Sequence, residues 1–277
     1  RHGSRWLPHD SRYEWVLQQF SDKSNLTPRG KSVRVRLQKV WENARGNGGK
    51  LTSLGAKQHR GIARRMLHNF PMIFRGDASV EAHSSIVDRC VKSMEAFADE
   101  LKAQQPSLHV ATVADSAEMR YLSYDSPDLK LLQRETTIPL GISTHRFAAN
   151  LFKNPSRLED AQRLMSELFT IASDMQDIEG LDINLFDVFT DEEMHALYVW
   201  NCTKMFHQNG RGAASRDIPA QCAANLWQDF VEKADEAMAH GRPAAHLRFG
   251  HDTALYRLLA LLKATPTLPT APDGIHG

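Results

Sequence analysis

Cysteine is scarce in this chain of 277 residues: there are three, at positions 90, 202 and 222. No two of them are spaced as Cys-x-x-Cys, so a zinc knuckle is not expected. Cys90 falls among the apolar positions of an expected helix, which favours a packed free thiol. Cys202 and Cys222 flank a Gly- and Ala-rich loop at 209–215 and could pair in an oxidising compartment, so a disulfide between them is left open.

Long apolar runs and an excess of charge are also missing. The sequence has no uninterrupted apolar stretch of about 18 residues, so we expect no membrane-spanning helix. Its formal net charge is +1, which gives no overall attraction to nucleic acid. With 42% hydrophobic and 24% charged residues, the composition is that of a soluble globular protein. The length allows one large domain, or a core with an inserted cap.

The most informative segment that is present opens the chain: Arg1-His2-Gly3-Ser4-Arg5. An imidazole can attack phosphorus and form a covalent phosphohistidine, which divides one difficult displacement into two easier steps. Guanidinium groups match the oxygens of a phosphoryl group with paired hydrogen bonds. A glycine after the histidine leaves no Cβ in the way of a phosphate. These residue types together predict phosphoryl transfer to His2.

A second pair, His251-Asp252, lies near the other end of the chain. An aspartate beside a histidine can protonate a leaving alcohol, which is the partner reaction that a phosphohistidine enzyme needs. The pair alone is common and means little, and Arg89 alone would be read as an ordinary ion-paired arginine. Both become informative only together with the other motif segments, because the order and spacing of all these segments fit one pattern.

Four segments together carry a resemblance to the histidine phosphatase superfamily, and to its acid phosphatase and phytase branch. The segments are Arg1-His2-Gly3-Ser4-Arg5, Leu51-Thr52-Ser53-Leu54-Gly55, Ser84-Ser85-Ile86-Val87-Asp88-Arg89-Cys90-Val91-Lys92-Ser93, and His251-Asp252. Residues 89–97 and 197–202 resemble multiple inositol polyphosphate phosphatases. Those enzymes often carry His-Ala-Glu where this chain has His251-Asp252, which leaves the subfamily open.

The resemblance implies a role for each site residue. His2 is the nucleophile and Asp252 the proton donor, while Arg1, Arg5, Arg89 and His251 hold the phosphate oxygens. No cofactor is implied, and no metal site is expected because arginines offset the charge and the histidines are scattered. The implied partner is a small phosphate ester rather than nucleic acid, and the implied location is periplasmic or secreted. A strand precedes the motif in this family, so we expect the chain to be part of a longer protein.

The order of elements predicts an α/β fold. Strands are expected at 79–83, 108–113 and 245–249, with a strong helix over 85–104, which indicates a mostly parallel sheet with helices on both faces. Helical patterns fill 156–175, 190–209 and 223–240. The predicted domains are a core over 1–125 with a helical excursion at about 11–49, a mainly helical cap over 126–220, and a second part of the core over 221–277. His251 and Asp252 then lie at the ligand-binding edge of the sheet.

Substrate choice depends on a basic segment, 23–39, which contains no acidic residue. Its cations could line the mouth of the pocket and bind extra phosphates, and we take Lys23, Lys31, Arg34 and Arg36 as candidates. A helix with a basic face can equally well face solvent. The first reading favours inositol polyphosphates, including phytate. The alternatives are a broad-specificity acid phosphatase acting on sugar phosphates, and an inactive module that binds polyanions. A phosphoglycerate-mutase-type enzyme fits the motif context less well.

Overall fold

The computed structural model describes residues 1–212, 215–240 and 244–264. Within them the chain divides into two compact units. One contains Arg1–Ser4, Ser53–Thr137 and the described residues from Cys202 onward; the other contains Arg5–Thr52 and Ile138–Asn201. The helical excursion expected at about 11–49 therefore belongs with 138–201. Residues 126–137 and the described residues of 202–220, expected in the cap, belong to the unit that carries the sheet.

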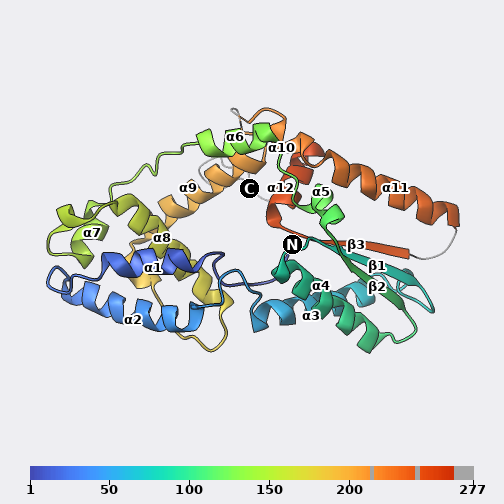
Figure 1. Ribbon diagram of the computed structural model, residues 1–277, viewed down its shortest axis with the longest axis horizontal. Coiled ribbons are helices and arrows are strands. Elements are labelled where there is room, and N and C mark those ends of the chain that lie inside the picture. Colours follow the sequence, from blue (N-terminus) through green and yellow to red (C-terminus); the bar gives the residue numbers. More distant parts are fainter. Residues whose placement is uncertain (213–214, 241–243, 265–277) are drawn as a thin grey trace. The chain divides into compact units, whose positions relative to one another are not determined.

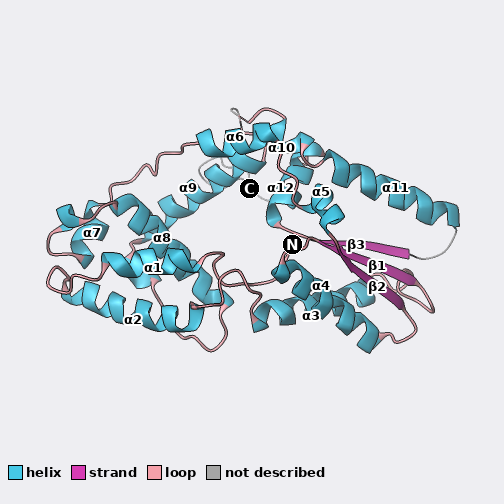
Figure 2. Cartoon of the chain, in the orientation of Figure 1, coloured by secondary structure: helices cyan, strands magenta, loops and turns pink. Residues whose placement is uncertain are grey.

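The first unit contains a three-stranded sheet, in which all pairings are parallel (Figure 2). The strands are β1 (Ser79–Ser84), β2 (His109–Ala114) and β3 (Ala244–Phe249), in the order β2-β1-β3. All three coincide with predicted strands, and the predicted α/β class is confirmed. Since the strands are parallel, the segments that follow them meet at one edge.

One face of the sheet is apolar and packs on two helices, α3 (Ser53–Asn69) and α4 (Asp88–Gln104), as Figure 1 shows. Along β1, Val80 and Ala82 are buried while the residues between them are more exposed, which is the alternation expected of a strand covered on one side. Phe97 of α4 meets Phe249 of β3 edge-on, with ring centroids 5.4 Å apart. This packing fixes the start of α4 relative to the end of β3.

The opposite face of the sheet is polar and lies next to α11 (Ala224–His240). Arg248 of β3 donates to Asp229 of α11 at 2.5 Å, and both side chains are almost completely buried. A buried ion pair of this kind mainly fixes which groups meet, because desolvation offsets much of its attraction. It therefore sets the position of α11 against β3.

Short helical elements complete the first unit. They are η1 (Ser116–Glu118), α5 (Met119–Leu122), α6 (Pro127–Glu135), α10 (Ile218–Gln221) and α12 (Asp252–Leu261). The sequence patterns do not predict α5 or α6, because each is short and only weakly periodic.

All three cysteines are free thiols, so the pairing of Cys202 with Cys222 that the sequence leaves open is not formed.

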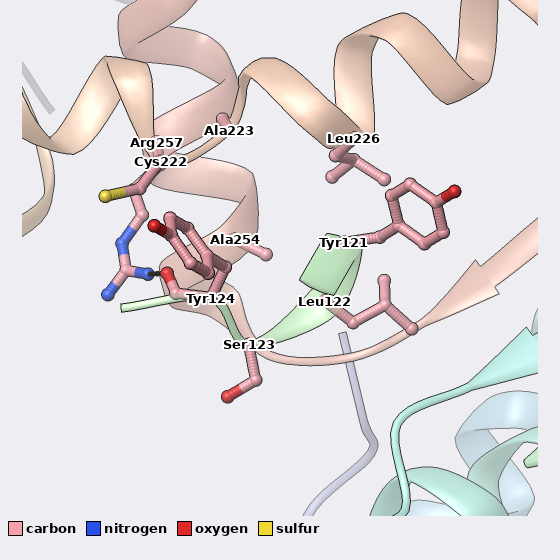
Figure 3. Close-up of a pocket in the computed structure, with 9 residues that line it drawn as sticks. All are labelled: Tyr121, Leu122, Ser123, Tyr124, Cys222, Ala223, Leu226, Ala254 and Arg257. Carbon is pink, nitrogen blue, oxygen red and sulfur yellow. Dashed lines mark hydrogen bonds between the residues drawn. The ribbon is translucent and has the colours of Figure 1, made fainter. Parts of the chain in front are cut away.

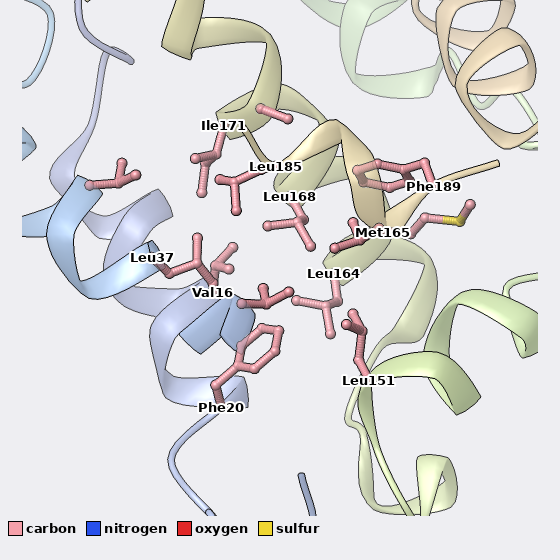
Figure 4. Packing of buried hydrophobic residues seen from close by; sticks show 14 of the residues in the cluster. Val16, Phe20, Leu37, Leu151, Leu164, Met165, Leu168, Ile171, Leu185 and Phe189 are labelled. Atoms are coloured by element: carbon pink, nitrogen blue, oxygen red, sulfur yellow. The ribbon is translucent and has the colours of Figure 1, made fainter. Parts of the chain in front are cut away.

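The second unit is helical in its described elements. They are α1 (Asp10–Gln19), α2 (Pro28–Ala44), α7 (His145–Leu151), η2 (Pro155–Arg157), α8 (Ala161–Asp174), η3 (Met175–Asp177) and η4 (Phe186–Val188). A further helix, α9 (Asp191–Asn209), begins in this unit and ends in the first. Apolar side chains at helical spacing, such as Val16, Leu37, Leu164 and Leu168, form one core (Figure 4).

The start of α2 differs from the sequence-based expectation. The Pro and Gly of Pro28-Arg29-Gly30 would favour a break before a helix at 31–45, but the helix begins at Pro28. Proline suits the first helical position because the N–H that it lacks would have no partner there. Thr27 caps the helix by accepting from the Gly30 N–H at 3.0 Å. The predicted loop at 209–215 and the predicted loop after 264 extend to residues outside those that the structure describes.

Gly30 provides a test of the packing between α2 and α7. A Cβ at this position would lie 2.1 Å from the carbonyl oxygen of Leu151. We expect Gly30→Ala to lower the free energy of unfolding by about 1–3 kcal/mol, because backbone must move to relieve the overlap. Chemical denaturation monitored by circular dichroism measures this change.

Gly61 in α3 is the matched control for this prediction, because a Cβ there would meet only the end of the Arg65 side chain, at 3.3 Å. Gly61→Ala should raise stability by about 1 kcal/mol through helix propensity. Equal effects of the two substitutions would contradict the close packing at Gly30.

Candidate active site

Three segments of the first unit meet at the carboxyl ends of β1 and β3. The N–H of His2 donates to the carbonyl of Gly250 at 2.9 Å, directly after β3. The N–H of Ser85, directly after β1, donates to the carbonyl of Phe249 at 3.1 Å. These backbone bonds bring together His2, His251 and the first turn of α4, which carries Arg89. The structure thus assembles residues from the two ends of the chain with one from its middle.

His2 is buried, with 7% of its surface exposed, and its ring has a defined tautomer. Nδ1 lies 2.8 Å from the carbonyl oxygen of Gly3. A carbonyl oxygen only accepts, so Nδ1 carries the proton. Nε2 of the neutral ring then holds the lone pair, and it is the atom that can act as a nucleophile.

Gly3 permits a close approach of the motif to α3. A Cβ on Gly3 would lie 2.5 Å from the carbonyl oxygen of Gly55, so no larger residue fits without moving backbone. The N–H of Gly3 donates to Ser93 Oγ at 3.1 Å, and Ser93 Oγ donates to the carbonyl of Arg89 at 2.7 Å. These two hydrogen bonds connect the loop that carries His2 to the helix that carries Arg89.

His251 faces Arg89 and His2. Arg89 Nη2 lies 3.4 Å from His251 Nδ1, and the rings of His2 and His251 are nearly perpendicular, with centroids 5.6 Å apart. A guanidinium only donates, so the contact with Arg89 requires a lone pair on Nδ1. Burial, and then the charge of Arg89, lower the pKa of His251 and favour the neutral ring.

Cys90 is completely buried and lies against the ring of His251. Its Sγ donates to the carbonyl of Gly250 at 3.4 Å and lies 3.8 Å from His251 Nε2. Burial raises the pKa of the thiol, so it remains protonated at neutral pH. Cys90 is therefore the packed free thiol that its helical context predicts, and it also supports the ring of His251.

Asp252 is the first residue of α12, and its Oδ1 accepts from the N–H of Thr253 at 2.9 Å. Arg1 is exposed. Five of the predicted site residues, Arg1, His2, Arg89, His251 and Asp252, thus belong to one unit.

His59 of α3 is a buried residue beside the motif to which the sequence assigned no role. Only 4% of it is exposed, and its ring lies 5.7 Å from that of Phe249. Burial lowers the pKa of His59 to about 4. A hydrogen bond with the backbone of Arg1 opposes it. His59 is thus a neutral packing residue beside the motif.

Arg5 belongs to the second unit, where it contacts Asp174. The basic segment lies in the same unit: Lys23 and Lys31 are exposed, and Arg34 donates to Gln38 at 3.1 Å. Arg36 forms an ion pair with Asp187 at 2.7 Å, so an acid far away in the sequence offsets part of its charge. The absence of acidic residues within 23–39 gave no indication of this partner.

A small cavity lies close to Gly250 in the same unit as the sheet (Figure 3). It is lined by Tyr121, Leu122, Ser123, Tyr124, Cys222, Ala223, Leu226, Ala254 and Arg257. Its volume of about 10 Å³ holds about one water molecule. Arg257, which donates to the carbonyl of Tyr124 at 2.8 Å, also pairs with Asp125 at 2.8 Å. The residues that line the cavity pack around α12, and the cavity itself is too small for a phosphate ester.

Among the described residues, no group of three or more histidine, cysteine or acidic side chains could hold a metal ion. In the same part of the chain, no helix is both long and apolar enough to cross a bilayer.

The sequence matches no family model and no curated protein, but its fold matches solved structures. A multiple inositol polyphosphate phosphatase from Bifidobacterium longum, in complex with inositol hexasulfate, superposes with a TM-score of 0.75 at 15% identity. The match covers 96% of this chain and 74% of that one. A phytase from D. castellii matches with a TM-score of 0.69 at 16% identity, over 99% of this chain and 63% of that one.

The phytase of Klebsiella sp. ASR1 also matches, with a TM-score of 0.55 at 13% identity, over 97% of this chain and 72% of that one. These solved structures are the phytases and the inositol polyphosphate phosphatase that the four motifs resemble. At such identities the likeness concerns the fold, and the chain has the fold that its motifs predict.

Proposed function

We propose that the chain is a phosphomonoester hydrolase of the histidine acid phosphatase type, acting through a phosphohistidine on inositol polyphosphates, including phytate. The observation that supports this best is the meeting of His2, Arg89 and His251 at the carboxyl ends of two parallel strands. His2 directs its Nδ1–H to the Gly3 carbonyl, which leaves Nε2 as the nitrogen that can attack. The fold shared with phytase structures agrees with the proposal.

In the first step, His2 Nε2 attacks phosphorus and forms a P–N bond while the bond to the leaving oxygen breaks. The Gly3 carbonyl accepts from Nδ1–H and so stabilises the positive charge that develops on the ring. Asp252, in its protonated form, gives its proton to the leaving oxygen. The products are an alcohol and phospho-His2.

In the second step, water attacks the phosphorus of phospho-His2. Asp252 is now a carboxylate and accepts a proton from this water, while the P–N bond breaks and its electron pair returns to Nε2. Inorganic phosphate leaves, and both residues return to their initial protonation states.

The nonbridging oxygens are assigned to Arg1, Arg5, Arg89 and His251. Guanidinium groups offset the charge on these oxygens without help from a metal ion. Burial and the charge of Arg89 favour the neutral ring of His251, which presents a lone pair to Arg89. An anion beside the ring favours the imidazolium, which then donates a hydrogen bond to a phosphate oxygen.

The preference for several phosphates rests on Lys23, Lys31, Arg34 and Arg36 as additional anion contacts. A broad-specificity acid phosphatase would not need them, and an inactive polyanion-binding module would bind without turnover. Phosphate release from phytate compared with that from an aryl phosphate separates these three functions. A periplasmic or secreted location belongs to the same proposal.

The nucleophile is tested by His2→Ala. Wild-type protein should trap a phosphoryl group that is acid-labile and base-stable, and the variant should lose it. Turnover should fall by several orders of magnitude, because no other group takes over nucleophilic attack. The exposed His9 provides a control in His9→Ala, which should behave as wild type. Near-normal activity of His2→Ala would refute the mechanism.

The proton donor is tested by Asp252→Asn, which keeps the shape of the side chain and removes its proton. Hydrolysis of alkyl phosphates should suffer far more than that of activated aryl phosphates, because a phenolate leaves with little protonation. Asp88→Asn is a matched control, since Asp88 is exposed and also begins a helix. Equal losses on both substrates would exclude Asp252 as the general acid.

The substrate class is tested by neutralising Lys31, Arg34 and Arg36 with glutamine. The KM for phytate should rise at least about tenfold while that for a simple aryl phosphate stays constant, because each lost charge-assisted contact is worth roughly 1.5–3 kcal/mol. High salt should reduce the difference. The same substitutions at the exposed residues Lys102, Lys130 and Arg134 remove equal charge from the other unit. If both triple variants respond alike on both substrates, the broad acid phosphatase is favoured.

A further inference from the structure

Asp174 is a buried carboxylate tied to the second arginine of the motif. It is the last residue of α8 and is 6% exposed. Its Oδ2 accepts from the N–H of Leu7 at 3.2 Å and from the hydroxyl of Tyr13 at 3.1 Å, and its Oδ1 accepts from Arg5 Nη1 at 3.4 Å. All four residues belong to the same unit. A carboxylate held at three points can fix the orientation of the side chain that it contacts.

Arg5 contacts Asp174 through a single nitrogen of its guanidinium group, Nη1. Arg5 Nη1 donates both to Asp174 and, at 3.3 Å, to the carbonyl of Trp6. Within the part of the chain that the structure describes, these are the hydrogen bonds of the Arg5 side chain. The edge formed by Nε and Nη2 therefore keeps its donors for an anion, and such an edge matches two oxygens of a phosphate.

We propose that Asp174 is a positioning residue for Arg5: it holds Nη1 so that the Nε and Nη2 edge of the guanidinium remains available to an anion. This inference rests on the proposed function, in which Arg5 binds a phosphate oxygen. The sequence gave no sign of it, because 169 positions separate the two residues.

The protonation state of Asp174 provides a specific readout. Burial raises the pKa of Asp174 to about 6, although Arg5, Tyr13 and the Leu7 N–H oppose the shift. Asp177 of η3 is the other charged group that acts on it, and its charge raises the pKa further. Above this pKa the carboxylate is ionised and attracts Arg5; below it the neutral carboxyl loses most of that attraction. Asp174→Asn imitates the protonated form at every pH.

The test is calorimetric binding of inositol hexasulfate to wild type and Asp174→Asn between about pH 4.5 and pH 7.5. Sulfate esters keep their charge over this range, whereas phosphate esters titrate near pH 6 and would obscure the step. At high pH the variant should bind about tenfold more weakly, and near pH 4.5 the two proteins should bind alike. Asp187→Asn, which removes an exposed partner of Arg36, should not show this pH-dependent ratio.

Two further variants separate positioning from a general structural effect. In an Arg5→Ala background, Asp174→Asn should cause no additional loss of affinity, because it acts through Arg5. Tyr13→Phe removes a hydrogen bond to the carboxylate, so the pKa of Asp174 and the midpoint of the pH step should both rise. Additive losses, or a midpoint that Tyr13→Phe leaves unchanged, would overturn the inference.

The remaining outcomes distinguish this inference from the proposed function. If Asp174→Asn binds as tightly as wild type at every pH, or more tightly, Asp174 does not position Arg5, and the phosphatase proposal stands on His2. If wild type binds the sulfate ester as expected but hydrolyses no phosphate ester, the proposed function fails and the role of Asp174 in anion binding is retained. If wild type does not bind the sulfate ester at all, both fail.

Discussion

The hydrogen bond between the His2 N–H and the Gly250 carbonyl is the contact on which the candidate site depends. It joins the first residues of the chain to the turn after β3, where His251 follows at once. The same carbonyl accepts from the thiol of Cys90 in α4. One backbone oxygen therefore connects His2, the His-Asp pair and the helix that carries Arg89. A parallel sheet makes this possible, because all its strands end at the same edge.

Close backbone packing supports this arrangement from the side of α3. Gly3 and Gly55 approach each other so closely that a Cβ on Gly3 would overlap the carbonyl of Gly55. The glycine of the motif is thus needed for close packing against α3. His59, one helical turn after Gly55, fills the space beside Arg1 and Phe249 as a neutral ring. Together these residues fix the loop that carries His2 without adding charge.

Burial controls the protonation of the groups around the motif. It lowers the pKa of His59 and His251, and raises the pKa of Cys90 and Asp174. For His59, His251 and Cys90 the neutral form is favoured, whereas Asp174 is ionised above a pH of about 6 and pairs with Arg5. The arginines therefore remain the principal fixed charges beside the buried histidines and the thiol.

The sequence by itself determined the strands, the strong helices and the motif residues, because these depend on local periodicity and on short spacings. The alternation of side chains at 79–83 and the strand that ends before His251 could be predicted without knowledge of distant partners. Tertiary structure alone decided that Arg5 meets Asp174 and Arg36 meets Asp187, and that 11–49 packs with 138–201. Such contacts join positions more than 100 residues apart, and neither periodicity nor spacing encodes them. The tautomer of His2 and the shifted pKa values likewise arise only when the fold has excluded water and placed a carbonyl or a charge beside each group.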